Sequence, residues 1–198
     1  VLEAARVLRK YAGNLSQTIR FALWGVEEIG LIGSKEYVKQ HMDELDNFRF
    51  YFNMDGAGSI KQKDVVLNEW YELEPLFEAW QKEMALDFAV GQSVHAHSDH
   101  FPFLMQGVPT GGMETVVKNL SGRGYGHTKY DTLDKIELRL LREAAAMGAR
   151  LALRIANTDE WTVARRPVAT VQAILNQIQY REERQIQAEI KAFIAKMQ

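Results

Sequence analysis

Two spacings of hydrophobic residues alternate along the chain. Short runs rich in β-branched and aromatic residues are typical of strands and predict them at 18–24, 48–54, 65–67, 88–90 and 108–113. Apolar residues at helical spacing predict helices at 1–8, 34–44, 74–86 and from Asp131 or Thr132 to about 156. Strands that alternate with helices predict an α/β fold with a mainly parallel, mixed sheet and helices on both faces.

The two ends of the chain differ from this pattern. Residues 1–8 already have helical spacing with no capping residue before them, so we expect the sequence to begin inside a domain. After a break at 165–167, an amphipathic pattern predicts one long helix over about 170–197. We expect it to pack on the domain, and self-association into a homo-oligomer is the alternative.

Composition removes several classes of function. The 198 residues are 46% hydrophobic and carry a net charge of −2, so no basic surface indicates a nucleic-acid partner. The sequence has no cysteine, which excludes thiolate metal sites and thiol nucleophiles and leaves the compartment open. No apolar run approaches the roughly 20 residues that a transmembrane helix needs.

A pair of glutamates carries the strongest chemical signal. Glu27 and Glu28 follow the predicted strand 18–24 and precede a Gly-Leu-Ile-Gly-Ser turn. Adjacent side chains point in different directions, so one carboxylate can bind a metal ion while the other takes a proton from the attacking water. Most Glu-Glu pairs are only solvated charge or a favourable start to a helix, and the surrounding strand and turn distinguish this one.

Two further residues lie where such a site would need them. Asp55 ends the next predicted strand, although Asp followed by Gly is usually only a turn. His127 stands in a Gly-rich loop before a predicted helix, where a lone His is more often a surface residue. In a parallel sheet both positions belong to the carboxyl-terminal edge, where active sites occur.

The ordered motifs resemble the M28 (aminopeptidase Y-like) zinc aminopeptidases. They are Glu-Glu-x-Gly-Leu-x-Gly-Ser at 27–34, Asn-x-Asp at 53–55, Ser-Asp-His-x-x-Phe at 98–103 and His-Thr-x-x-Asp-Thr at 127–132. Four motifs in this order rarely coincide by chance. The resemblance covers roughly residues 1 to 157, which we expect to be a partial peptidase domain, with 158–198 as a C-terminal helical extension.

The resemblance implies a role for each residue. Glu27 is expected to be the general base and Glu28 a zinc ligand that shares its metal with His127, while Asp55 binds a second zinc. The implied activity is hydrolysis of N-terminal peptide bonds of a peptide substrate, with two zinc ions in the complete protein. The family's first ligand motif and its bridging Asp would lie upstream of this sequence. We therefore expect the N-terminal strands to be missing and the fragment to be inactive alone.

Four other residues are candidates for the substrate site. Ser98, Asp99 and His100 belong to the third motif and are expected to begin a helix beside the site. Tyr125 lies close to His127, but the family often has Tyr directly before this His, and here Gly126 intervenes.

Three alternatives compete with this interpretation. The first is a fragment or degenerate relative whose fold serves as a binding or assembly module, and the presence or absence of the upstream ligands in a longer sequence discriminates it from a peptidase. The run from His95 to His100 also fits the His-x-His-x-Asp-His pattern of metallo-β-lactamase-like hydrolases, but only His127 follows it. A carboxypeptidase or deacylase with paired glutamates is the third, and the turn after the pair argues against it.

Overall fold

The computed structural model describes residues 1–58, 63–114 and 125–197, and four strands of this part form one sheet. The strand order is β1-β4-β2-β3, in which β1 pairs with β4 and β2 with β3 in parallel, while β2 and β4 are antiparallel. The prediction of a mainly parallel, mixed sheet is confirmed. The strands are β1 (Tyr51–Asn53), β2 (Asp64–Leu67), β3 (Val90–Gln92) and β4 (Thr110–Glu114).

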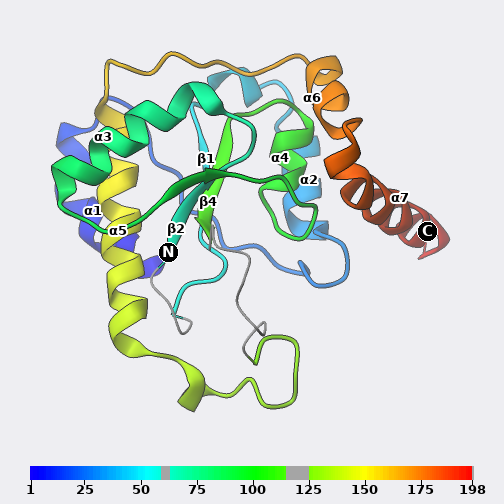
Figure 1. Cartoon of the computed structure of the whole chain (residues 1–198), viewed down its shortest axis with the longest axis horizontal. Helices are drawn as coiled ribbons and strands as arrows, with labels where there is room; N and C mark the ends of the chain where they lie inside the picture. Colours follow the sequence, from blue (N-terminus) through cyan, green and yellow to red (C-terminus); the bar gives the residue numbers. More distant parts are fainter. Residues whose placement is uncertain (59–62, 115–124, 198) are drawn as a thin grey trace.

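The helices lie on both faces of this sheet, as predicted (Figure 1). One face is covered by α1 (Leu2–Leu8), α3 (Glu74–Met84) and α5 (Leu138–Asn157), and the other by α2 (Ile32–Gln40), α4 (Phe101–Met105) and α6 (Val168–Leu175). Trp70, Phe77 and Leu151 are almost fully buried in the core between the sheet and the first set. Among the described residues, no helix is long and apolar enough to cross a bilayer.

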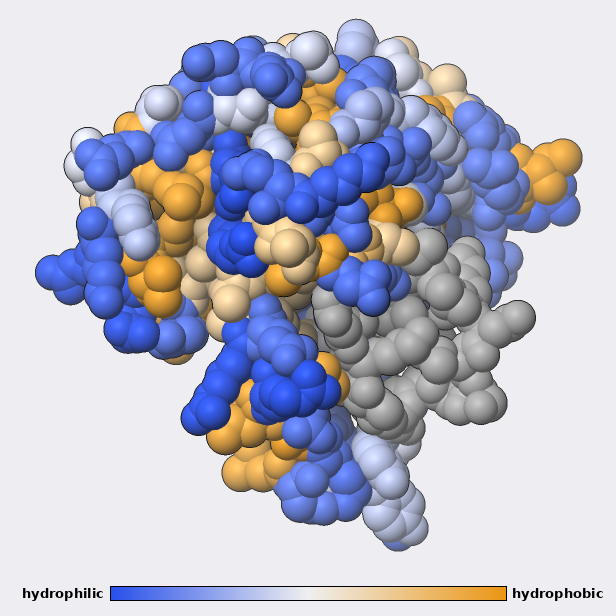
Figure 2. Space-filling view, turned by 60° about the vertical axis from the view of Figure 1, so that its left-hand side comes forward, coloured by the Kyte–Doolittle hydropathy of each residue, from blue (hydrophilic) through white to orange (hydrophobic). Residues whose placement is uncertain are grey.

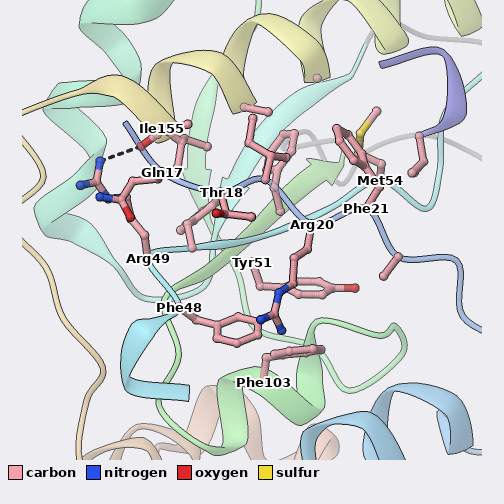
Figure 3. Close-up of a pocket in the computed structure, with 18 of the residues that line it drawn as sticks. Gln17, Thr18, Arg20, Phe21, Phe48, Arg49, Tyr51, Met54, Phe103 and Ile155 are labelled. Carbon is pink, nitrogen blue, oxygen red and sulfur yellow. Dashed lines mark hydrogen bonds between the residues drawn. The ribbon is translucent and has the colours of Figure 1, made fainter. Parts of the chain in front are cut away.

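Residues 18–24 do not form the predicted strand. The segment passes the edge strand β1 across a cavity of about 590 Å³, so the two backbones do not pair (Figure 3). Side chains hold it in this position. The Arg20 guanidinium donates to the Tyr37 hydroxyl (2.8 Å) and to the Glu44 carboxylate (2.6 Å), and the Trp24 indole donates to the Tyr51 hydroxyl (2.8 Å).

The predicted helix from Asp131 or Thr132 to about 156 begins later than expected. Thr132 precedes a single 3₁₀ turn (Leu133–Lys135), and α5 begins only at Leu138. The intervening Ile136 and Glu137 are extended, and the Glu137 N–H donates to the Gly58 carbonyl oxygen (3.2 Å). A continuous helix would lose this contact with the loop that follows β1.

The predicted C-terminal helix is divided into α6 and α7 (Arg181–Met197). The break at Gln177 is extended, and it is followed by a 3₁₀ turn in which Tyr180 is buried and hydrogen-bonded to Glu69. A straight helix would not place Tyr180 there. The α6 helix packs on α4, in agreement with packing on the domain, whereas self-association through the apolar stripe stays a prediction.

The segment between α5 and α6 is fixed to the body near Gly107. The Arg166 N–H donates to the Gly107 carbonyl (2.8 Å), and the Arg166 guanidinium lies 3.6 Å from the centre of the Trp70 ring. Gly107 has a φ of 81°, and a Cβ there would lie 1.9 Å from the Arg166 carbonyl oxygen. Only glycine combines this backbone conformation with such a close approach.

We expect Gly107→Ala to lower the free energy of unfolding by at least about 1 kcal/mol, because the left-handed conformation alone costs that much for a residue with a Cβ. Urea denaturation measures the change. Gly13→Ala is the matched control, since a Cβ at Gly13 meets no atom within 4 Å and its φ lies outside the left-handed region. Its stability should stay the same or rise by up to about 1 kcal/mol. Equal effects of the two substitutions would contradict the packing described for Gly107.

Candidate functional site

The glutamate pair lies in a tight turn rather than at the end of a strand. The Glu27 carbonyl oxygen accepts hydrogen bonds from the N–H groups of Gly30 (3.0 Å) and Leu31 (2.9 Å). Val26 and Leu31 adopt positive φ angles of 62° and 59°, which are uncommon for such residues. Leu31 is buried in a cluster with residues of α4 and α6, so the turn that presents Glu28 is anchored from behind.

Glu28 and His127 are close to each other, as predicted. The Glu28 Oε2 and His127 Nε2 atoms are 3.5 Å apart, and both side chains are more than 70% exposed. Zinc bonds of 2.0–2.2 Å in a tetrahedral arrangement place neighbouring ligand atoms about 3.4 Å apart. This pair therefore fits two adjacent ligands of one zinc ion.

The exposure of His127 has a structural cause. The loop that carries it and the start of α5 project from the body at the bottom of Figure 1, and hydrophobic surface is visible on this projection in Figure 2. Leu133 is 86% and Leu138 is 55% exposed. His127 itself has a φ of 61° within a turn, so local backbone geometry rather than core packing directs it toward Glu28.

Asp55 is held by a chain of two hydrogen bonds that begins at a buried residue. It follows β1, and its Oδ2 accepts a bond of 2.6 Å from the Ser98 hydroxyl. Ser98 in turn accepts a bond of 2.9 Å from the Asn53 side-chain amide. Asn53 and Ser98 are both buried, so this chain fixes the orientation of the Asp55 carboxylate.

Glu27 lies among these groups. Partial burial raises its pKa, and the negative charges of Glu28, Asp55 and Asp99 raise it further, to about 7, while His127 opposes the shift. Each of these residues is therefore close enough to act on Glu27, although they come from four separate parts of the sequence. A carboxylate in this position could take a proton from a neighbouring water molecule.

The other predicted site residues have different surroundings. Asp99 is buried and accepts a hydrogen bond of 2.5 Å from the Ser34 hydroxyl. His100 is buried beside His95 and Glu114. Tyr125 is 45% exposed, and its ring contacts the Lys135 ammonium group, which lies 5.2 Å from the ring centre.

The donor atoms of the predicted ligands do not form a complete metal site. Within the described residues, the one set of three His, Asp or Glu donor atoms that lie within 4.8 Å of one another consists of His95, His100 and Glu114. The sequence interpretation did not include Glu114. Its position directly after the strand predicted at 108–113, at the edge of the sheet where active sites occur, could have indicated it as a ligand.

Comparison with known proteins decides the family. The model of peptidase family M28 matches residues 1–152. The chain belongs to peptidase family M28. The resemblance drawn from the four motifs is thus confirmed. Because the match includes residues 95–100, the metallo-β-lactamase-like alternative is wrong.

Two relatives of this M28 chain are named as a leupeptin-inactivating enzyme and as a probable aminopeptidase. Leupeptin-inactivating enzyme 1 of Streptomyces exfoliatus is 32% identical over 114 residues, which are 57% of this chain and 26% of the relative. The probable lipoprotein aminopeptidase LpqL of Mycobacterium tuberculosis is 33% identical over 131 residues, and the match again covers 57% of this chain and 26% of the relative. The chain therefore spans about a quarter of the length of these two curated relatives.

A solved structure supports the fold. BSAP, a zinc aminopeptidase from Bacillus subtilis, matches with a TM-score of 0.65 at 23% identity over 83% of this chain and 41% of its own. This likeness shows that the chain shares its fold with part of that structure.

We expect Ser98→Ala to lower the free energy of unfolding by about 1–3 kcal/mol, because the buried Asn53 amide loses its acceptor. Chemical denaturation checks the change. Ser16→Ala removes a hydroxyl from an exposed residue and should change stability by no more than about 0.5 kcal/mol. If both serines could be replaced equally well, the buried chain from Asn53 to Asp55 would not stabilise the site.

Proposed function

We propose that this chain carries part of the active site of a zinc-dependent aminopeptidase, in which Glu27 is the general base. The observation that carries the proposal is the set of groups around Glu27, in which Glu28 and His127 are at ligand spacing and Asp55 is close enough for its charge to act on Glu27. The names of the M28 relatives support peptide hydrolysis from the N-terminus.

Glu28, His127 and Asp55 are the residues that would hold zinc. Their carboxylate and imidazole donors suit this metal, and the 3.5 Å between Glu28 and His127 fits two ligands of one ion. Zinc, when bound, supplies a Lewis acid that acidifies water and polarises the peptide carbonyl. Asp55 would belong to a second ion, and Ser98 orients its carboxylate in the same way that outer hydrogen bonds orient metal ligands elsewhere.

Glu27 would take the proton from the attacking water and pass it to the leaving amine. Its backbone is fixed by the two hydrogen bonds that its carbonyl accepts from Gly30 and Leu31. The carboxylate is therefore presented from a rigid turn, which general base catalysis requires for a proton transfer of fixed geometry.

The described residues supply fewer protein ligands than a catalytic zinc usually has. Glu28 and His127 would give two ligands to one ion and Asp55 one to the other, whereas three are typical. We propose that residues outside this sequence complete both positions. The chain spans about a quarter of the length of its curated relatives, which leaves room for them. The 198-residue chain alone should then bind these ions weakly.

In the protein that carries this chain, we expect Glu27→Gln to lower kcat/KM for an aminoacyl amide by about 10²–10⁴-fold, since a general base is lost. Its zinc content should stay nearly unchanged. Glu28→Gln is the matched neighbour and should lower both zinc content and activity, because it removes a ligand. Elemental analysis and steady-state kinetics measure the two quantities. Near-normal turnover by Glu27→Gln would contradict the assignment of the base.

A second measurement tests the role of residues outside this sequence. The 198-residue chain is titrated with zinc by calorimetry and assayed for hydrolysis of an aminoacyl amide. His95→Gln is introduced so that the set of His95, His100 and Glu114 does not bind the added zinc. This variant should bind zinc weakly and show little hydrolysis. Tight binding of two zinc ions with clear turnover would show that the described ligands suffice. A complete parent protein that binds zinc but hydrolyses no aminoacyl substrate would instead favour a binding or assembly module.

A further inference from the structure

Two histidines and one glutamate meet at a place that the proposed peptidase site does not use. His95 follows β3, His100 directly precedes α4, and Glu114 ends β4. One donor atom from each lies within 4.8 Å of the other two. The His95 and His100 rings are in contact, with centroids 4.6 Å apart at an interplanar angle of 75°.

His100 is the unusual member of this cluster. Its side chain is 1% exposed, and neither ring nitrogen has a hydrogen-bond partner among the residues that the structure describes. The backbone of His95 lies near the ring without meeting hydrogen-bond geometry. A buried polar group without a partner costs about 1–3 kcal/mol, so such a residue calls for a physical explanation.

His100 is also in the chemical state that a ligand requires. Burial holds its pKa well below the usual range, and the neighbouring His95 lowers it further, so the ring is neutral. A neutral imidazole has a free electron pair on one nitrogen, which is the form that binds metal ions.

The other two members favour a cation between them. The His95 Nε2 atom is 2.8 Å from the Glu114 Oε1 atom, and these side chains are 21% and 26% exposed. Burial disfavours a charged His95, but its hydrogen bond to Glu114 and the charges of Glu114, Glu183 and Asp55 raise its pKa overall. The surroundings are therefore negative on balance, and solvent can reach them.

We propose that His95, His100 and Glu114 form a binding site for a divalent transition-metal ion, in the first place zinc. Two imidazoles and one carboxylate are a donor set that zinc uses when it has three protein ligands and one open position. The same set also suits ferrous iron, so the metal must be identified by experiment. The site is independent of the role proposed for Glu27 and of the ligands Glu28 and His127.

Metal binding requires small adjustments, because donor atoms that now lie within 4.8 Å of one another would be about 3.4 Å apart on tetrahedral zinc. The contact of 2.8 Å between His95 and Glu114 must widen by about half an ångström, because ligand atoms on tetrahedral zinc are about 3.4 Å apart. A metal on His95 Nε2 also needs a proton on Nδ1, where the His97 N–H now donates at 3.3 Å. That hydrogen bond is long and therefore weak. Its loss costs less free energy than His100 gains when its unpartnered ring nitrogen binds the metal ion.

The matched control for this site is His97. Its ring stacks beside that of His95, with centroids 5.8 Å apart, but it is not a member of the cluster and its side chain is 55% exposed. An adventitious metal bound by surface histidines would depend on His97, whereas the proposed site would not.

The experiment measures metal stoichiometry and affinity in the protein that carries this chain. The apoprotein is titrated with Zn²⁺ and, in a separate anaerobic experiment, with Fe²⁺, and bound metal is quantified by elemental analysis. His95→Gln and Glu114→Gln are compared with His97→Gln. Glu114→Gln keeps a hydrogen-bond acceptor for His95, so it should fold even if His95→Gln is destabilised, and circular dichroism checks this.

We expect His95→Gln and Glu114→Gln each to lose one equivalent of metal, or to bind it at least about 100-fold more weakly, since loss of an outer partner alone costs about 10–100-fold. His97→Gln should bind metal with the affinity and stoichiometry of the parent protein. The double variant Glu28→Gln/His127→Gln should keep the one equivalent of metal bound by His95, His100 and Glu114. Unchanged metal binding in folded His95→Gln and Glu114→Gln would overturn the proposal and leave an ordinary hydrogen bond. An equal loss in His97→Gln would overturn it in favour of adventitious surface binding.

Discussion

Hydrogen bonds made by Ser98 and Asp99 join parts of the chain that are far apart in sequence. Ser98 connects Asn53 at the end of β1 with Asp55, and Asp99 accepts a bond from Ser34 at the start of α2. Because Ser34, Asn53, Ser98 and Asp99 are buried, each of these polar groups would cost free energy without its partner. The geometry of the candidate site therefore depends on this short segment, although neither residue is a predicted metal ligand.

The sequence predicted the elements whose formation depends on local pattern. The runs that became β1, β2 and β4 carry clear strand signals, and Asp55 was placed correctly just after β1. The strand predicted at 88–90 overlaps β3 only at Val90, since β3 runs through Gly91 to Gln92. Residues 18–24 carry an equally clear signal but form no strand, because a cavity separates their backbone from β1 and only side chains, such as that of Trp24 on Tyr51, reach across. Strand propensity describes the fit of side chains to a sheet and does not supply a neighbouring strand.

Residues of the site were harder to predict when their position depends on a break in a helix. The apolar stripe over 170–197 correctly indicated amphipathic helix, but it did not indicate the break at Gln177. As a result of that break, Glu183 of α7 accepts a hydrogen bond of 2.6 Å from the N–H of Ala96. Ala96 lies between His95 and His97 in the loop that follows β3. Ile190 and Ile194 reach the turn at Gly30. The C-terminal helix thus contacts segments that carry both proposed metal sites.

Asp55 connects the electrostatics of these two sites. Its negative charge raises the pKa of Glu27 on one side and that of His95 on the other, in each case alongside larger effects. A cation bound beside Asp55 would therefore lower the pKa of both Glu27 and His95, because charges at short range interact strongly where water is partly excluded. Glu28 and His127, by contrast, are exposed on a turn and a projecting loop. In the cluster of His95, His100 and Glu114 one ligand is buried, and a metal ion there would change the charge balance around Asp55 without touching the proposed base.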